Sequence, residues 1–417
     1  MRSIFVHHVP KRYNSLEKRK TRMNIKEIQK EIAAEKAQAW VMVDYENKNP
    51  VVADYLDHQM LTRKIFLVIP STGEPFVIAH FIDTVFLNGI SKEKGFRIHS
   101  YNTWQEMKAA VEDELKGYDS ILMDISSDGL LPRVSLADYG SVDYIKHIVK
   151  NVKSSANVMQ IITAKLSEKA YDSQKKACKL ALKIKDKAFR KIREDILSKG
   201  KSDEYEIQQF ICRRFVEEGL TYDEAPIVAI GPNASNPHYG PTEKNHSPIK
   251  PGDLVLIDMW AKEDIPEGVY ADITWMGYVG DSVPEKYRER FAVVKAARDG
   301  VISFLERELP KRKVMAYEAD DVARRIITDA GYGQYFLHRV GHNIAVDVSP
   351  HGPGANLDNY ETHDDRVLIE GTSFSDEPGI YAPDFGMRSE TDLHNENDNL
   401  VVLAGLQDEI IPIMGEN

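Results

Sequence analysis

Cysteine is scarce in this chain, with only Cys178 and Cys212 among its 417 residues. These two cysteines provide neither a disulfide framework nor the paired spacing of a zinc ribbon, so we expect both to be buried apolar side chains in a reducing compartment. Long apolar runs are also missing, because none approaches the roughly 18 residues that a membrane-spanning helix needs. The sequence therefore predicts no membrane partner.

Positive charge is in deficit, because 54 Lys and Arg residues face 65 Asp and Glu residues and leave a net charge of −11. This balance disfavours nucleic acid as a partner. The first 22 residues depart from it, with seven Lys or Arg and one acid. Their longest apolar run, residues 4–6, is too short for the core of a signal peptide, so we interpret residues 1–23 as a basic leader and expect a cytoplasmic protein.

The length and the hydrophobic pattern divide the remaining residues into two domains. The first, residues 24–155, alternates predicted helices with predicted strands, which is typical of an α/β domain with a mixed sheet (strands at 39–44, 65–70, 75–80, 97–101 and 120–125). The second, residues 156–417, begins with a long amphipathic helix at 167–197. A helix at 202–218 comes next, and strands and two further helices follow it (strands at 227–231, 253–261, 269–280, 373–381, 386–393 and 399–403; helices at 284–307 and 315–330). The predicted fold class is α/β (α+β).

Two aspartates stand at strand positions in the second domain. Asp258 follows the apolar run Leu254–Ile257, and Asp272 lies in the next predicted strand, beyond the turn signal Pro266–Gly268. A carboxylate at the end of a buried strand is costly unless it is paired or binds a cation. The two strands could form a hairpin that directs both carboxylates to one point, although each aspartate alone could also be structural.

Two glutamates repeat this arrangement, because Glu377 and Glu390 lie on adjacent strand-like segments separated by a loop. Between the two acidic pairs stands the segment HRVGH, which ends at His342. Four converging carboxylates would repel one another unless divalent cations neutralised them. Oxygen-rich ligands with one histidine suit manganese, magnesium, cobalt, iron or zinc, and two such ions can activate a water molecule and polarise a carbonyl.

The motifs LVLID, VYADIT, HRVGH, EPGIY and GMRSE occur in this order and resemble those of the creatinase/aminopeptidase, or pita-bread, metallopeptidases. This family includes Xaa-Pro aminopeptidases, prolidases and methionine aminopeptidases. The resemblance covers roughly residues 156–417 and implies a pita-bread catalytic domain there, after a creatinase-type N-terminal domain at residues 24–155. That additional domain favours an Xaa-Pro aminopeptidase or a prolidase over a methionine aminopeptidase.

The resemblance also implies a ligand set for two divalent metal ions, with manganese as the first expectation and cobalt, zinc or iron as alternatives. Asp272 and Glu390 would bridge both ions, Asp258 would hold one, and His342 and Glu377 would hold the other. Family members commonly form dimers, so a homodimer is expected.

Four further residues match catalytic or substrate-binding positions of the family. His238 would line the substrate pocket, although it could be only a turn histidine beside Pro237. His338 would hydrogen-bond the substrate, and His351 would steady the tetrahedral intermediate. Arg388 would pair with the metal-site carboxylates or reach the substrate, and a purely structural ion pair is an equal alternative.

The chain departs from the family pattern within the first two motifs. Asp258 and Asp272 are fourteen positions apart, three more than is usual, and we expect the polar hairpin loop at residues 262–267 to absorb the difference. Trp275 stands where an arginine is frequent, so any role of that arginine is lost or moved. Trp260 replaces a small residue and would either narrow the pocket or only pack, and we favour packing.

The spacing also departs after the histidine ligand. The catalytic histidine normally stands seven positions after that ligand, where this chain has Ser349, whereas His351 is nine positions after it. Because the following segment HGPGANLD looks like the usual continuation, we interpret Ser349 and Pro350 as an inserted pair that bulges outward.

The sequence thus predicts a metallopeptidase that hydrolyses Xaa-Pro peptide bonds by means of a hydroxide bridging two metals, acting on small peptides with proline in the second position. Glu377 would also carry a proton beside its ligand role. Two alternatives stay open: a hydrolase or lyase of the same fold acting on a non-peptide small molecule, and a non-catalytic binding protein on that fold.

Overall fold

The structure, a computed structural model, describes residues 24–415, so the predicted leader at 1–23 lies outside the described residues. The chain divides into two compact units, with the division between Thr163 and Ala164. The sequence pattern placed it one helix earlier, between residues 155 and 156. Helix α6 (Ala156–Thr163) belongs to the N-terminal unit because Val158 and Met159 pack into the core of that unit.

The N-terminal unit contains a six-stranded sheet in the order β4-β3-β2-β1-β5-β6. The strands are β1 (Ala39–Asp44), β2 (Ile65–Pro70), β3 (Phe76–His80), β4 (Arg97–Tyr101), β5 (Ser120–Met123) and β6 (Asn151–Ser154). The central strand β1 pairs antiparallel with β2 and parallel with β5, so the sheet is mixed, as the alternation of strands and helices indicated.

Helices cover both faces of this sheet, which explains why β1 is buried along its whole length. Trp40 and Met42 pack in a core with α1, α2, α3 and α6, whereas Val41 and Val43 pack in a second core with α4 and α5. The helices, besides α6, are α1 (Ile25–Ala34), α2 (Pro50–Tyr55), α3 (Phe81–Lys94), α4 (Trp104–Leu115) and α5 (Tyr139–Lys146). Side chains of a strand alternate between faces, so this division into two cores follows from the sequence of β1.

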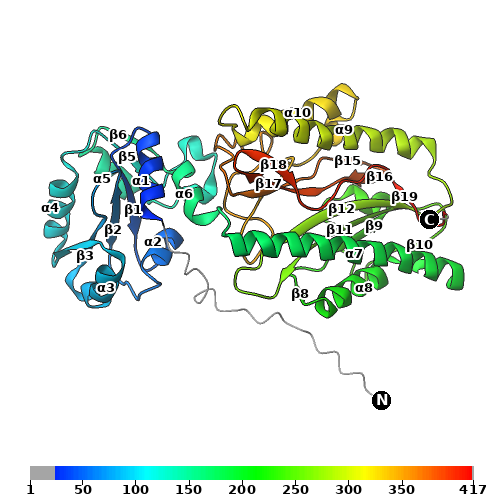
Figure 1. Ribbon diagram of the computed structural model, residues 1–417, viewed down its shortest axis with the longest axis horizontal. Helices are drawn as coiled ribbons and strands as arrows, with labels where there is room; N and C mark the ends of the chain where they lie inside the picture. The colour runs from blue at the N-terminus through cyan, green and yellow to red at the C-terminus, as the bar shows by residue number, and fades with distance from the viewer. Residues whose placement is uncertain (1–23, 416–417) are drawn as a thin grey trace, which may run out of the picture. The chain divides into compact units, whose positions relative to one another are not determined.

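The C-terminal unit contains a sheet in which β11 (Leu254–Glu263) pairs antiparallel with β12 (Ala271–Tyr278), β9 (Ile227–Ile230) and β8 (Leu220–Thr221). Strand β19 (Ile411–Pro412) adds to β12. Four helices enclose the unit, as Figure 1 shows: α7 (Glu168–Lys199), α8 (Glu204–Glu217), α9 (Glu285–Glu308) and α10 (Ala316–Asp329). Ser167 caps the start of α7, and Gly200, at a φ of 73°, ends it.

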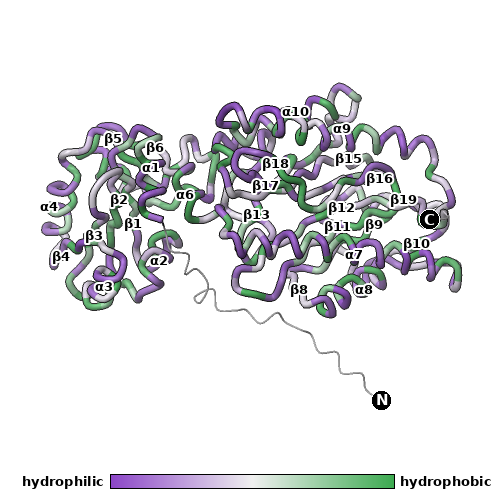
Figure 2. The backbone as a smooth tube through the Cα atoms, viewed as in Figure 1, coloured by the Kyte–Doolittle hydropathy of each residue, from purple (hydrophilic) through white to green (hydrophobic). Residues whose placement is uncertain are grey.

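Alternation along β11 determines which of its side chains reach the interior of the unit. Ile257 and Met259 pack beneath α7 and α8, whereas Leu254 and Leu256 pack in the core formed with α9 and α10. Figure 2 shows the matching pattern on α7, where hydrophilic and hydrophobic segments alternate along the helix. Residues at even positions of β11 therefore face away from α7.

A second sheet in this unit has the order β13-β14-β17-β18. Its strands are β13 (Asn343–Ile344), β14 (Ser373–Asp376), β17 (Thr391–Glu396) and β18 (Asn399–Val402), and the hairpin of β15 (Gly379–Ala382) and β16 (Phe385–Arg388) lies between β14 and β17 in sequence. The continuous strand expected at 373–381 is two strands, because Pro378 cannot donate a hydrogen bond to a ladder. Among the residues of the structure, no helix combines the length and apolar character that crossing a membrane requires.

Candidate metal centre

The antiparallel pair β11–β12 brings the two predicted aspartates to one face. Asp258 lies opposite Thr274, and Asp272 lies opposite Trp260. Since side chains two positions apart share a face, all four of these residues project to the same side, away from α7. Asp258 and Asp272 are buried, with 6% and 4% of their surface exposed.

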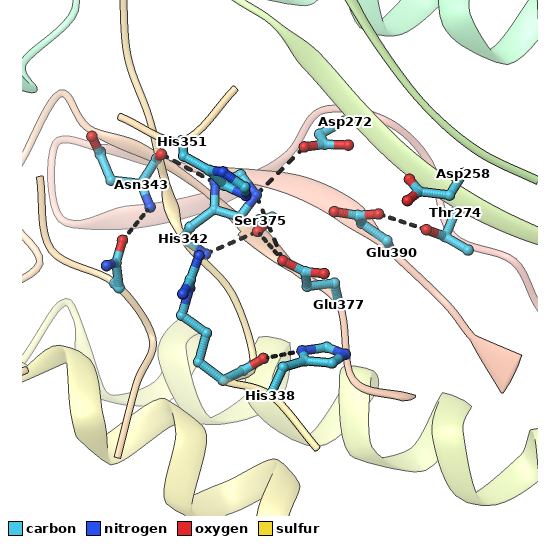
Figure 3. Close-up of polar contacts among 12 residues, drawn as sticks. Asp258, Asp272, Thr274, His338, His342, Asn343, His351, Ser375, Glu377 and Glu390 are labelled. Atoms are coloured by element: carbon cyan, nitrogen blue, oxygen red, sulfur yellow. Dashed lines mark hydrogen bonds and ion pairs between the residues drawn. The ribbon is translucent and has the colours of Figure 1, made fainter. Parts of the chain in front are cut away.

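The two predicted glutamates approach this face from β14 and β17. Glu377 follows β14 and Glu390 precedes β17, and the adjoining residues Asp376 and Thr391 are paired across the two strands. Thr274 Oγ1 donates to Glu390 Oε2 at 2.7 Å, which ties the second acidic pair to the first. Figure 3 shows Asp258, Asp272, Glu377 and Glu390 grouped around one region of the site.

His342 lies beside these carboxylates because the backbone at Gly341 approaches the backbone at Ser375 closely. A side chain at Gly341 would lie 2.0 Å from the Ser375 backbone oxygen, so only glycine fits there. The Nδ1 atom of His342 lies 3.2 Å from the Asn343 carbonyl oxygen, which only a protonated Nδ1 can satisfy. The Nε2 atom then points to the carboxylates, 3.4 Å from Asp272 Oδ2 and 3.6 Å from Glu377 Oε1 (Figure 3).

The electrostatics of this cluster favour a cation. Burial and then neighbouring carboxylates raise the pKa of Asp272 and of Glu390 well above the usual range, and burial raises the pKa of Glu377 to about 7. Donor atoms of Asp272, His342 and Glu390 all lie within 4.8 Å of one another. These three residues could therefore hold a metal ion, with the carboxylates of Asp258 and Glu377 beside it.

Arg388 connects the carboxylates to the rest of the site. Its Nη2 atom forms a buried ion pair with Asp258 Oδ2, and its Nε atom donates to Thr274 Oγ1 at 2.8 Å. The Nε atom also lies 3.9 Å from Glu390 Oε2. Pairing with the site carboxylates is one of the three roles expected for Arg388, and these contacts are compatible with it.

Tyr381 is a further site residue, which the sequence indicated only as part of the EPGIY motif. Its hydroxyl lies 2.8 Å from Arg388 Nη1, which donates to it, and 2.7 Å from His338 Nε2. His338 Nδ1 lies 2.6 Å from the Arg339 carbonyl oxygen. Because Nδ1 must donate to that carbonyl, Nε2 accepts from Tyr381, and both ring nitrogens of His338 have partners within the protein. Burial and the nearby Arg388 lower the pKa of His338 to about 3, so the ring is neutral.

All of the predicted site residues line one cavity of about 350 Å³. Its lining includes Asp258, Asp272, His342, Glu377, Glu390, His238, His338, His351 and Arg388. The His351 ring stands edge-on to the His342 ring, with 4.1 Å between the ring centroids. Ser349 and Pro350 line the cavity too, and Pro350 is buried. The expectation that this pair bulges outward was therefore wrong, because both residues form part of the cavity wall.

Trp260 also lines the cavity, so the preferred interpretation of Trp260 as a packing residue only was incomplete. Its Nε1 atom donates to Asp223 Oδ1 at 2.7 Å, and the ring packs at the edge of a small core around Tyr270. Strand alternation from Asp258 places Trp260 on the cavity side, and this signal was present in the sequence.

A further buried aspartate, Asp392, supports the site from behind. Asp392 Oδ2 accepts a hydrogen bond from the Asp272 backbone N–H at 3.0 Å and another from Cys178 Sγ at 3.1 Å. Cys178 and Cys212 are both buried, as the sequence predicted. Asp392 stands two residues after Glu390 in the same strand-like segment, and this spacing is the signal by which the sequence could have indicated it.

Comparisons with known proteins match much of this chain to one family. The profile of metallopeptidase family M24 matches residues 173–397, which is more than half of the chain. An Xaa-Pro dipeptidase from Lactobacillus delbrueckii subsp. lactis is 41% identical over 165 residues, covering 39% of this chain and 40% of the relative. One from Pyrococcus horikoshii is 31% identical over 251 residues, covering 60% of this chain and 65% of the relative. Each alignment thus spans less than two thirds of the relative's length.

Solved structures show the same fold over most of the chain. The crystal structure of the prolidase from Pyrococcus horikoshii matches with a TM-score of 0.55 and 25% sequence identity, covering 93% of this chain and 99% of that protein. This likeness confirms the predicted fold, an α/β domain followed by a pita-bread domain.

Proposed function

Because the chain belongs to metallopeptidase family M24, we propose that it hydrolyses Xaa-Pro peptide bonds in small peptides, as a dipeptidase or an aminopeptidase. The observation that carries this proposal is the convergence of Asp258, Asp272, His342, Glu377 and Glu390 on one cavity. The names of the relatives, which are Xaa-Pro dipeptidases and a prolidase, supply the substrate class.

The residues present fit a pair of divalent cations. Asp258 Oδ1 is buried without a hydrogen-bond partner, and burial with neighbouring carboxylates raises the pKa of Asp272 and of Glu390, which supports cations as partners of this cluster. Asp272 and Glu390 would hold both ions, Asp258 one of them, and His342 with Glu377 the other. When bound, the ions supply a water activated for attack at neutral pH and polarise the scissile carbonyl. Carboxylates with one imidazole suit manganese first, then cobalt, zinc or iron.

Other side chains of the cavity would position the substrate and move a proton. Glu377 would take a proton from the attacking water and pass it to the leaving proline nitrogen. Ser375 Oγ donates a hydrogen bond to Glu377 Oε1 at 3.2 Å and holds this carboxylate in place. His351, beside His342, would donate a hydrogen bond to the oxyanion. His238 lies at the exposed edge of the cavity, where it would contact the substrate. His338 would act through Tyr381, because both of its ring nitrogens are occupied.

A substrate panel tests the proposal. Metal-free protein is loaded with manganese, cobalt, zinc or iron and given Xaa-Pro dipeptides, Xaa-Pro-Yaa tripeptides and matched Xaa-Ala peptides. We expect kcat/KM for Xaa-Pro to exceed that for Xaa-Ala by at least about tenfold, a difference of roughly 1.4 kcal/mol. Hydrolysis of the tripeptides would indicate an aminopeptidase, and hydrolysis of dipeptides alone a dipeptidase. Equal rates on Xaa-Pro and Xaa-Ala would contradict the proposal. The expected homodimer and cytoplasmic location stay predictions.

A further inference from the structure

One wall of the catalytic cavity is acidic and aromatic. Asp223, Glu224 and Trp260 line it, and we call these three residues the Trp260 wall. Asp223 and Glu224 lie in the loop between β8 and β9, and Trp260 projects from β11. Trp260 is the cross-strand neighbour of Asp272, so the wall begins directly beside the candidate metal ligands.

Hydrogen bonds within the Trp260 wall hold one of its carboxylates in place. Asp223 Oδ1 accepts from Trp260 Nε1 at 2.7 Å and from the Glu224 backbone N–H at 3.0 Å. Both donors use the same oxygen, so Oδ2 stays available as an acceptor. Trp260 thereby fixes the orientation of a charged group as well as providing an apolar surface.

The negative charge of this wall is not compensated within the protein. No Lys or Arg among residues 24–415 forms an ion pair with Asp223 or Glu224. Two other acidic residues of the cavity differ in this respect, since Glu361 pairs with Arg339 at 2.7 Å and Asp258 pairs with Arg388. A positively charged group of the substrate would therefore find its partner at the Trp260 wall.

Resting on the proposed Xaa-Pro peptidase function, we infer that the Trp260 wall selects substrates whose first residue carries a cationic side chain, lysine or arginine. The exposure of the two wall carboxylates indicates that they bind this side chain and not the substrate's α-ammonium group. Four of the five candidate metal ligands are buried, all but Glu377, whereas Asp223 and Glu224 are exposed. An α-ammonium group stays beside the scissile carbonyl at the buried level, and only a long side chain reaches the exposed carboxylates.

Trp260 fits the remainder of such a side chain. The methylene groups of lysine or arginine pack favourably along an indole while the charged end stays near water. A cation close to an indole face gains a further attraction from the ring electrons. The wall thus offers an apolar surface beside the candidate ligand Asp272 and two carboxylates farther from it, where the charged end of the side chain would lie.

The test compares Lys-Pro with norleucine-Pro, which has a similar length and no charge, and with Ala-Pro and Glu-Pro, on the full-length metal-loaded protein. We expect kcat/KM for Lys-Pro to exceed that for norleucine-Pro by about fivefold to tenfold, with Glu-Pro below both; tenfold corresponds to about 1.4 kcal/mol. The ratio is measured within one preparation, so differences in metal loading or folded fraction cancel. Added salt should reduce it, because exposed charges are screened.

Variants assign the preference to the wall. Glu224→Gln and Asp223→Asn should each lower the Lys-Pro to norleucine-Pro ratio to about half or less, and the double variant should bring it near one. Trp260→Phe, which keeps an aromatic ring but cannot donate to Asp223, should lower it partly. Glu243→Gln, an exposed acid outside the cavity, is the matched control and should keep the wild-type ratio.

The outcomes separate this inference from the proposed function. If wild-type protein hydrolyses Ala-Pro but treats Lys-Pro and norleucine-Pro within about twofold of each other, the inference is overturned and the peptidase function stands. A lysine preference that survives in the double variant also overturns it, since another part of the cavity would then be responsible. If the metal-loaded protein hydrolyses no Xaa-Pro peptide, both fail together.

Discussion

The side chains of the candidate metal centre contact one another as well as the cations that they would hold. Arg388 contacts Asp258, Thr274 and Tyr381 at once, and Thr274 in turn donates to Glu390. A change in one ligand is therefore transmitted to the others through a shared guanidinium and a shared hydroxyl. Measured effects of substitutions here should be far from additive, because residues within one network couple.

Removing the charge of one candidate ligand tests its assignment. Asp258→Asn and Glu377→Gln each delete a buried negative charge with little change in volume. We expect kcat/KM to fall by a factor of about 10³ or more, the order seen when electrostatic stabilisation of a transition state is lost. Kinetics on Ala-Pro with metal analysis of the same samples is the measurement. Asp281→Asn, at an exposed site outside the cavity, is the control, and activity within about threefold of wild type in a ligand variant would refute its role.

His351 and Ser349 both line the cavity, so kinetics must decide between them. The His351 ring lies 4.1 Å from the His342 ring and offers an N–H donor, whereas a serine hydroxyl is a weaker partner for an oxyanion. His351→Ala should lower kcat by about 10²–10³-fold with normal metal content, and Ser349→Ala should change it by less than about threefold. The reverse order of effects would make Ser349 the functional position and weaken the peptidase assignment.

Individual residues of the site also differ in whether the sequence alone could predict their roles. The five candidate ligands stand in short motifs of local sequence, so the sequence alone was enough to name them. The contacts of Tyr381 with His338 and Arg388 could not be named in this way, because they join segments 43 and 7 positions apart in sequence. The same limit applied to Pro350, whose burial depends on packing that no local pattern records.

Two elements whose lengths depart from the family pattern contact each other. The β11–β12 hairpin carries the longer spacing between the aspartates, and the segment 347–351 carries the displaced histidine. Lys262 Nζ donates to the Asp347 carbonyl oxygen, and the Tyr270 hydroxyl donates to the Val348 carbonyl oxygen at 2.9 Å. The hairpin therefore holds the loop that presents His351, and the two departures are parts of one arrangement.

Tyr270→Phe tests this arrangement, because Tyr270 is buried and phenylalanine preserves its packing. Losing one hydrogen bond should cost about 1 kcal/mol of stability, and the freed loop should lower kcat by about fivefold to tenfold with a smaller change in KM. Tyr101→Phe is the matched control, since Tyr101 also donates to a backbone carbonyl, that of Lys64, but in the N-terminal unit. Both variants should lose similar stability. If kcat falls equally in both or in neither, the hairpin does not position the loop.

At the scale of elements, most strands were predictable because their residues alternate or form short apolar runs. Strands such as β1 and β11, which are largely buried, were recognisable from their β-branched and apolar content. The boundary between the units was less predictable, since α6 looks alike in sequence whichever unit it packs on. Tertiary contacts, such as those of Val158 and Met159, assign it to the N-terminal unit.

At the scale of the whole molecule, the candidate ligands all belong to the C-terminal unit, so metal binding should stabilise the two units differently. In the metal-free protein, four carboxylates repel one another in a buried cavity, and cations that bind only the folded state remove this cost. An ion at 100 times its dissociation constant stabilises the folded state by about 2.7 kcal/mol. For a unit of this size, that corresponds to a rise in melting temperature of roughly 5–10 °C.

Calorimetry and hydrogen exchange, with and without a chelator, measure this difference. Chelation should lower the transition of the C-terminal unit and speed amide exchange in β11, β12, β14 and β17, while amides of β1, β2 and β5 keep their protection. Added manganese should restore both, and the loss of Xaa-Pro hydrolysis should follow the same titration. In the Asp258→Asn variant the manganese-dependent shift should shrink, because one ligand charge is gone. Equal melting temperatures and full activity in protein shown by elemental analysis to be metal-free would contradict a metal centre in this cavity.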